Sequence, residues 1–109
     1  MKMEERGIIL MDDEALMCPN CGNVYLHQDK VTVFNRDEDE ETEFVAEIQG
    51  KKAKAQLLPS SRTKNPSARR QGLTISFYCE CCPAKKLQMH ISQHKGTTYF
   101  KWDYQIKMK

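Results

Sequence analysis

Two pairs of cysteines with the same spacing constrain this chain more than any other feature of its sequence. Cys18 and Cys21 are separated by two residues, and the same gap separates Cys79 from Cys82. A turn of this kind points both thiols to one side, and two such turns can supply the four tetrahedral ligands of a structural Zn²⁺ ion. We therefore predict one zinc ion bound by Cys18, Cys21, Cys79 and Cys82, with no coordination position left open for catalysis.

A fifth cysteine competes for a place in the second pair. Cys81 could bind the metal instead of Cys82, but only Cys82 repeats the two-residue gap of the first pair. We therefore favour Cys82 and expect Cys81 to be a free thiol near the metal. Five cysteines is also an odd number, whereas extracellular disulfide frameworks normally use an even one.

A thiol redox function is an alternative, because the segment Cys18-Pro19-Asn20-Cys21 is similar to the CPxC motif of glutaredoxin-like oxidoreductases. That fold has a βαβ pattern around its motif. In this chain strand-like segments follow the motif, and a redox role for the first pair would leave the second pair unexplained. We regard the redox function as the weaker interpretation.

The length and composition favour a small metal-stabilised domain in the cytoplasm. A chain of 109 residues with 29% charged residues has a thin core, so a cross-link would help it hold one structure. The apolar run Ile8–Met11 is too short for a signal peptide, and no segment approaches the roughly 20 apolar residues of a membrane span. We therefore expect a cytoplasmic protein without contact with a membrane. In the reducing cytosol, paired cysteines more often bind metal than form disulfides.

Alternation of apolar and polar residues predicts a mostly β fold. Residues 31–35 and 44–49 alternate with a period of two on either side of a polar acidic turn, as expected for a hairpin. Residues 73–78 alternate in the same way and lead into the second cysteine pair. A C-terminal hairpin with a turn at 94–97 is predicted next, and its last strand places Phe100, Trp102, Tyr104 and Ile106 on one face.

The spacing of the cysteine pairs predicts an elaborated zinc ribbon. Between Cys21 and Cys79 lie 57 residues, where zinc ribbons commonly have about 15 to 20. We expect one zinc-ribbon-like domain over 18–109 with an inserted hairpin (31–49) and a basic loop (60–72). The segment 51–59 could be a short helix or a further strand.

The first seventeen residues form an N-terminal extension in this scheme. They could contain a short strand at Ile8–Met11 or a brief helix at Asp12–Met17, and the sequence does not decide between the two.

Charge is distributed unevenly although the net charge is only +2. Residues 1–50 carry 4 Lys and Arg against 13 Asp and Glu, giving −9, whereas residues 51–109 carry 13 against 2, giving +11. A basic half can attract nucleic acid or an acidic protein, and an acidic half can imitate nucleic acid. The simpler interpretation is that the opposite charges face each other within the domain.

Two sets of residues are candidate contacts for a partner. Cations of the basic loop and two tyrosines opposite the apolar rows could bind nucleic acid, the tyrosines by stacking on bases; these are Arg62, Lys64, Arg69, Arg70, Tyr78 and Tyr99. Six acids at the tip of the first hairpin could instead imitate a phosphate backbone and make the chain an inhibitor of a host enzyme, such as a defence nuclease of the CRISPR kind or a polymerase; these are Asp37, Glu38, Asp39, Glu40, Glu41 and Glu43.

No pattern in the sequence indicates an enzyme. A nucleophile with a base, a Gly-rich phosphate loop, an H-E-x-x-H motif and EF-hand spacing are all missing, and no small-molecule substrate is indicated. His90 and His94 have the H-x₃-H spacing of a zinc finger, but the flanking alternation predicts a strand, which would separate them by about 13 Å. We expect them, and His27 beside the first cysteine pair, to lie outside the metal shell, with His27 as a possible hydrogen-bond donor to it.

Much of the chain resembles a group of small zinc-ribbon proteins of bacteriophages and integrating mobile elements. The resemblance rests on CPNCGNVYLH, VTVFNRDED, NPSARRQGLTISFYCECC and QHKGTTYFKW, which span roughly residues 18–104. It implies a β-rich ribbon with the four predicted cysteine ligands and a variable third position in the second cysteine turn. The group has no assigned function, but the resemblance implies a partner in the nucleic-acid machinery of the host or phage. The first seventeen residues lie outside the resemblance.

Overall fold

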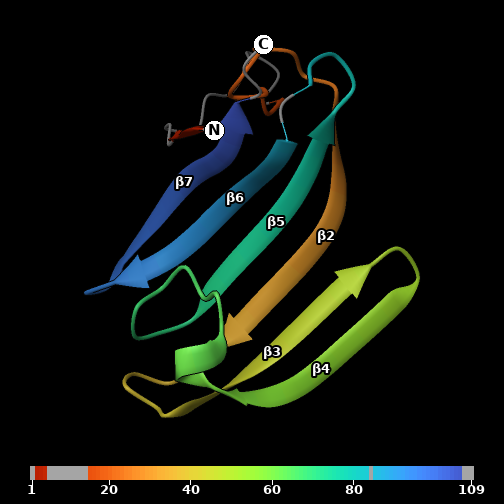
Figure 1. The fold of residues 1–109 in the computed structure, drawn as a ribbon. Coiled ribbons are helices and arrows are strands. Elements are labelled where there is room, and N and C mark those ends of the chain that lie inside the picture. Colours follow the sequence, from red (N-terminus) through yellow and green to blue (C-terminus); the bar gives the residue numbers. More distant parts are fainter. Residues whose placement is uncertain (1, 5–14, 84, 107–109) are drawn as a thin grey trace.

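The computed structural model describes residues 2–4, 15–83 and 85–106, and these form one antiparallel β-sheet. The spatial order of the strands is β1-β7-β6-β5-β2-β3-β4 (Figure 1). Their bounds are β1 Lys2–Glu4, β2 Leu26–Asn35, β3 Thr42–Gln49, β4 Lys52–Pro59, β5 Gly72–Cys79, β6 Lys85–His94 and β7 Thr97–Ile106. The described residues contain a single 3₁₀ turn, η1 Ser60–Arg62, and no α-helix. Accordingly, no described helix could span a membrane.

The mostly β fold and both predicted hairpins are confirmed. β2 pairs with β3 around the acidic turn, and β6 pairs with β7 around the turn that begins after His94. The segment 51–59, for which the sequence left two possibilities, contains the edge strand β4. Of the N-terminal alternatives, Ile8–Met11 lies outside the described residues, and the described part of the second, Ala15–Met17, is not helical.

The strand register places mostly apolar residues on one face of the sheet and mostly polar residues on the other, where Phe34, Val45 and Leu58 are the apolar exceptions. Opposed residues of an antiparallel pair point to the same face, so a row of partners can be followed across six strands. One face, called the apolar face below, has two rows of mainly apolar residues. The first row is Phe100, Ile91, Leu73, Val33, Ala46 and Ala55. The second row is Trp102, Met89, Ile75, Val31, Ile48 and Ala53. Two rows on the other, the polar face, consist of Lys101, His90, Thr74, Thr32, Glu47 and Lys54, and of Asp103, Gln88, Ser76, Lys30, Gln49 and Lys52.

The hydrophobic core covers one end of the apolar face. Trp102, Tyr104 and Leu87 are almost fully buried there, and Leu16 from the segment before β2 packs against them. Phe77 lies against Trp102 with ring centroids 5.5 Å apart and tilted planes, a favourable aromatic geometry. Phe100 was expected to share the face of Trp102 and does so, but it lies farther along β7, beyond the core, and is 52% exposed.

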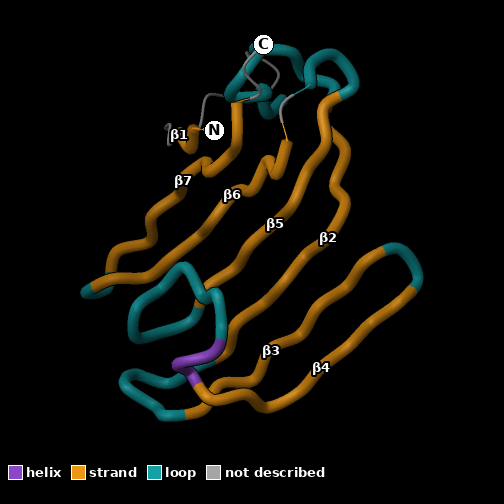
Figure 2. Tube along the Cα trace, viewed as in Figure 1, coloured by secondary structure: helices purple, strands orange, loops and turns teal. Residues whose placement is uncertain are grey.

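The loop between η1 and β5 is fixed to the sheet by polar side chains. Asn65 donates to the backbone oxygen of Arg70 at 2.8 Å and accepts from the backbone N–H of Ser67 at 2.9 Å. The Ser67 hydroxyl donates to the Gln71 backbone oxygen and accepts from the Gln93 backbone N–H, which connects the loop to β6. Gly72 leaves room for this arrangement, since a Cβ there would lie 2.1 Å from Asn65 Oδ1. Figure 2 shows this loop at the same end of the sheet as the acidic turn between β2 and β3.

Candidate metal centre and partner surfaces

Four cysteines cluster at the end of the sheet opposite the acidic turn. Cys18 Sγ lies 3.7 Å from Cys82 Sγ, and Cys21 Sγ lies 3.6 Å from Cys79 Sγ. All four sulfurs lie within 4.8 Å of one another. Four thiolates placed about 2.3 Å from a tetrahedral Zn²⁺ would have sulfurs about 3.8 Å apart. The cluster could therefore bind a metal ion such as zinc, because two of its sulfur contacts are already close to that spacing.

The sheet register brings the two cysteine turns together despite their separation in the sequence. Leu26, at the start of β2, is paired with Cys79, at the end of β5. The segment before β2 and the segment after β5 consequently meet at one end of the sheet, drawn in orange and cyan in Figure 1. The backbone N–H of Glu80 also donates to the Tyr25 oxygen at 3.1 Å, which connects the two segments directly.

The first turn has a backbone shape that Gly22 makes possible. Gly22 has a φ of 81°. This left-handed backbone conformation is energetically unfavourable for any residue that has a side chain. Its N–H donates to the Cys18 oxygen at 2.9 Å, and the Cys18 N–H donates to the Asn23 oxygen at 2.7 Å. Tyr104 from the core donates its hydroxyl to the Pro19 oxygen at 3.4 Å. The turn is therefore held both by its own hydrogen bonds and by the core.

The second turn places Cys82 in the cluster and Cys81 outside it, in agreement with the spacing argument. Cys81 is exposed, and its backbone N–H donates to Cys79 Sγ at 3.4 Å. Such a bond stabilises a sulfur that carries negative charge, as a metal-bound thiolate does. Cys81 thus supports the cluster through its backbone instead of its thiol.

Burial makes this cluster unfavourable for free thiolates. Cys18 is only 2% exposed, and in the absence of a metal ion burial raises its pKa from 9.0 to about 12. Burial also raises the pKa of Cys21. At neutral pH these thiols are protonated without a metal, and a divalent cation would replace their protons with a charge that compensates the thiolates.

None of the three histidines belongs to the described metal cluster. His27 stacks on Tyr78 with ring centroids 4.8 Å apart and planes 8° from parallel, and its Nε2 contacts the Glu80 carboxylate. His90 Nδ1 lies 2.9 Å from the Thr74 hydroxyl on the polar face. His94 ends β6 and is exposed.

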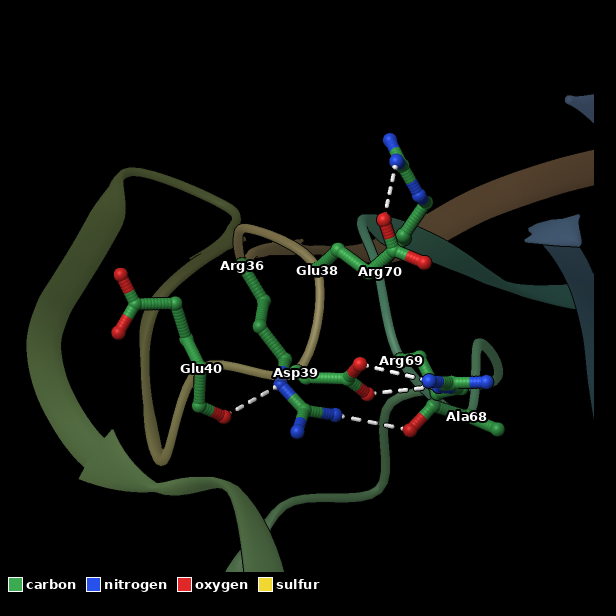
Figure 3. A network of polar contacts seen from close by, with 7 residues as sticks. All are labelled: Arg36, Glu38, Asp39, Glu40, Ala68, Arg69 and Arg70. Atoms are coloured by element: carbon green, nitrogen blue, oxygen red, sulfur yellow. Dashed lines mark hydrogen bonds and ion pairs between the residues drawn. The ribbon is translucent and has the colours of Figure 1, made fainter. Parts of the chain in front are cut away.

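The acidic turn and the basic loop pair with each other (Figure 3). Arg69 makes two contacts of 2.6 Å with the Asp39 carboxylate, and Arg70 contacts Glu38 at 2.9 Å. Arg36 donates at 2.8 Å to the backbone oxygens of Glu40 and Ala68 and so bridges the two segments. The Arg69 guanidinium lowers the pKa of Asp39, and Asp39 raises that of Arg69. These charges face each other within the domain, as the simpler interpretation of the charge asymmetry predicts.

The remaining acids of the hairpin differ in their surroundings. Asp37, Glu40 and Glu41 are exposed, whereas Glu43 is only 2% exposed. Asn65 donates to Glu43 Oε1 at 3.3 Å, and Glu43 Oε2 has no hydrogen-bond partner among the described residues. Glu43 is therefore not presented to a partner by this conformation of the protein.

A groove of about 270 Å³ lies on the polar face between the sheet and the loop after η1. Arg62 of η1 and Lys64 of the loop after it line one side of the groove. The sheet contributes polar residues, among them Lys30, Glu47, Thr74 and His90, together with the apolar side chains of Phe34, Val45 and Leu58. Tyr78 and Tyr99 are 54% and 50% exposed, and the register places them on this face at opposite ends. Sequence reasoning missed Lys30 and His90 as neighbours of Arg62, because only the long-range pairing of β2, β5 and β6 brings them together.

In comparisons with protein-family models, curated proteins and solved structures, no match to this chain was found.

Proposed function

We propose that this protein is a non-catalytic, elaborated zinc ribbon whose polar face binds single-stranded nucleic acid. The observation that supports this most strongly is the groove, which places Arg62 and Lys64 beside hydroxyl and amide side chains. Lys30 also lines it and is paired with Glu47 at 3.5 Å. Cations that follow a phosphate backbone and exposed aromatic rings that stack on bases are the two features shared by proteins that bind single strands. Tyr78 and Tyr99 supply such rings at either end of the polar face.

The metal would have a structural role in this proposal. Four cysteine ligands leave no position for a substrate or a water molecule, so an ion bound there orders the protein and does not catalyse a reaction. The ion would fix the two turns beside Tyr78, whose partner His27 contacts Glu80 of the second turn. A thiol redox function is less favoured, because close sulfur contacts of 3.7 Å and 3.6 Å join the two turns to each other, as a shared metal ion requires.

The inhibitor hypothesis receives less support from the same contacts. An acidic mimic needs free carboxylates, but Asp39 and Glu38 are engaged by Arg69 and Arg70, and Glu43 is buried. We retain this hypothesis as the second explanation if nucleic acid does not bind.

Fluorescence anisotropy with labelled single-stranded DNA and RNA at several salt concentrations tests the proposal. We expect binding that weakens with salt, and the double variant Arg62→Ala/Lys64→Ala should lower the slope of log K against log salt by about one unit or slightly more. The exposed residues Lys51 and Lys95 lie in turns and do not line the groove, so Lys51→Ala/Lys95→Ala removes the same charge as a control. Absence of binding at tens of micromolar protein in low salt, or an equal loss in both double variants, would contradict the proposal.

A further inference from the structure

The part of the apolar face beyond the core is exposed and carries no charge. Its large exposed side chains come from β2, β3, β4 and β7, and they are Val33, Phe44, Ile48, Leu57 and Phe100, called the apolar patch below. Leu57 is the most exposed of them at 69%. From Val31 to Asn35 in β2, and at the positions of β3 and β4 that the register places on this face, every residue is uncharged.

A sheet with one apolar face normally needs a second layer to cover it. The segment that contains Leu16 and Cys18 supplies that layer at the end of the sheet where the four cysteines and the core lie. No described residue covers the apolar patch in the same way, since its five large side chains remain between 43% and 69% exposed. The two halves of one face therefore differ in whether a second layer is present.

The size of the apolar patch matches one side of a protein interface. Five large side chains that are each about half exposed offer roughly 400 Å² of apolar surface, and the exposed alanines of β4 add to it. A stable interface buries about 800 Å² on each partner, of which about 60% is apolar. The largest apolar patch on an isolated protein typically covers about 300 to 600 Å² and often has a binding role.

We propose that the apolar patch is the interface of a homodimer in which two copies pack patch against patch. Two β-sheets pack face to face about 10 Å apart with interleaved apolar side chains, so a second copy supplies the missing layer. A two-fold axis needs only a self-complementary surface, and an apolar patch without charges has no like-charge repulsion with itself. The polar face of each copy then remains accessible on the outside of the dimer. This inference is independent of the proposed nucleic-acid binding.

Sedimentation equilibrium of the 109-residue chain, at roughly 1 to 100 µM, tests the inference. We expect a species of twice the 12.7 kDa mass of one chain. Leu57→Lys should weaken the dimer by about tenfold or more, because a lysine would be buried without a partner in both copies. Gln56→Lys changes the neighbouring residue, which the register places on the polar face, and should leave the dimer intact.

Phe100→Lys provides a second variant at the other side of the patch in case Leu57→Lys does not fold, with circular dichroism and zinc content as checks of folding. A monomer in the wild-type protein would overturn the inference, whether another part of this chain or a different partner covers the patch. A dimer that persists in both lysine variants would overturn it as well, because association would then use another surface, such as the free edge of β4.

Discussion

Leu26 and Cys79 lie opposite each other in the sheet, and this pairing connects the two halves of the candidate metal centre. It explains how cysteine turns separated by 57 residues can meet. The chain leaves the first turn along β2, forms the β3–β4 hairpin and the basic loop, and returns along β5 to the same end of the sheet (Figure 1). The inserted strands β3 and β4 extend the sheet beyond β2 at one edge. The two cysteine turns lie at the end of the sheet where β2 begins and β5 ends.

The two cysteines at the end of the second turn should respond differently to substitution. Cys82→Ser removes a sulfur from the cluster, so we expect loss of about one equivalent of zinc and of the folded structure. Cys81→Ser should retain both, because that residue contributes through its backbone N–H. Metal analysis and circular dichroism of the two purified variants measure this difference. Zinc retention in Cys82→Ser together with loss in Cys81→Ser would reverse the ligand assignment.

Metal binding should release protons and weaken in acid. Without metal, burial raises the pKa of Cys18 from 9.0 to about 12, so the metal-free fold keeps this proton at neutral pH. Stability from the buried neutral thiol is present below pH 9.0 and is lost as the pH rises toward about 12. The zinc form has the opposite dependence, because protons compete with the ion for the thiolates as the pH falls.

Isothermal titration calorimetry in buffers of different ionisation enthalpy counts these protons. We expect about four protons per zinc ion near pH 7, one for each thiol. A value near two would indicate that only one of the cysteine turns binds the ion.

Gly72→Ala should loosen the basic loop. The added Cβ would lie 2.1 Å from Asn65 Oδ1 and 2.9 Å from Pro66 Cδ, and Asn65 cannot move freely because it bonds the Ser67 N–H. We expect a loss of about 1–3 kcal/mol in the free energy of unfolding, measured by urea denaturation. Ser61→Ala, at an exposed position of η1, is the control and should change stability by less than about 0.5 kcal/mol. Equal stability of Gly72→Ala and the wild-type protein would show that the loop accommodates the methyl group.

The pairing of Arg69 with Asp39 predicts an unusual effect on nucleic-acid binding. Asp39→Ala removes a negative charge outside the groove, so binding to single-stranded nucleic acid should strengthen slightly through long-range attraction, and its salt slope should change little because no phosphate contact is added. Arg69→Ala should change the affinity much less than Arg62→Ala, since Arg69 is already neutralised and does not line the groove. Anisotropy titrations of the three variants measure both effects. If Arg69→Ala were the most damaging, the contact surface would lie on the basic loop and not in the groove.

Local patterns in the sequence predicted the hairpins, because period-two alternation in residues 31–35 and 100–106 reports directly on which side of a strand a residue lies. The cysteine cluster was predictable for a similar reason, since a two-residue gap is local geometry. The strand β4 was not, because its exposed Lys52, Ala53 and Lys54 intrinsically favour helix over strand, and pairing with β3 overrides that preference.

Long-range pairing produced the features that the sequence could not predict. The order of β2, β5 and β6 determines that Lys30, Thr74 and His90 share a groove, and no local signal encodes that order. The same holds for the contact of Asp39 with Arg69, which lie 30 residues apart in the sequence. Charge counts indicated that the acidic and basic segments could pair, but only the fold identifies the residues that do so.

The metal content of the purified protein tests the central claim most directly. Protein prepared without added metal and analysed by inductively coupled plasma mass spectrometry should contain close to one zinc per chain. Chelation should unfold the end of the sheet that carries the cysteines and the core around Trp102, and Trp102 fluorescence reports this change. Added zinc should restore the fold, because metal binding to such a site contributes roughly 10 to 16 kcal/mol in zinc-finger peptides. Zinc below about a tenth of an equivalent, with Trp102 fluorescence unchanged by chelator and by added zinc, would contradict the assignment of Cys18, Cys21, Cys79 and Cys82 as a structural metal site.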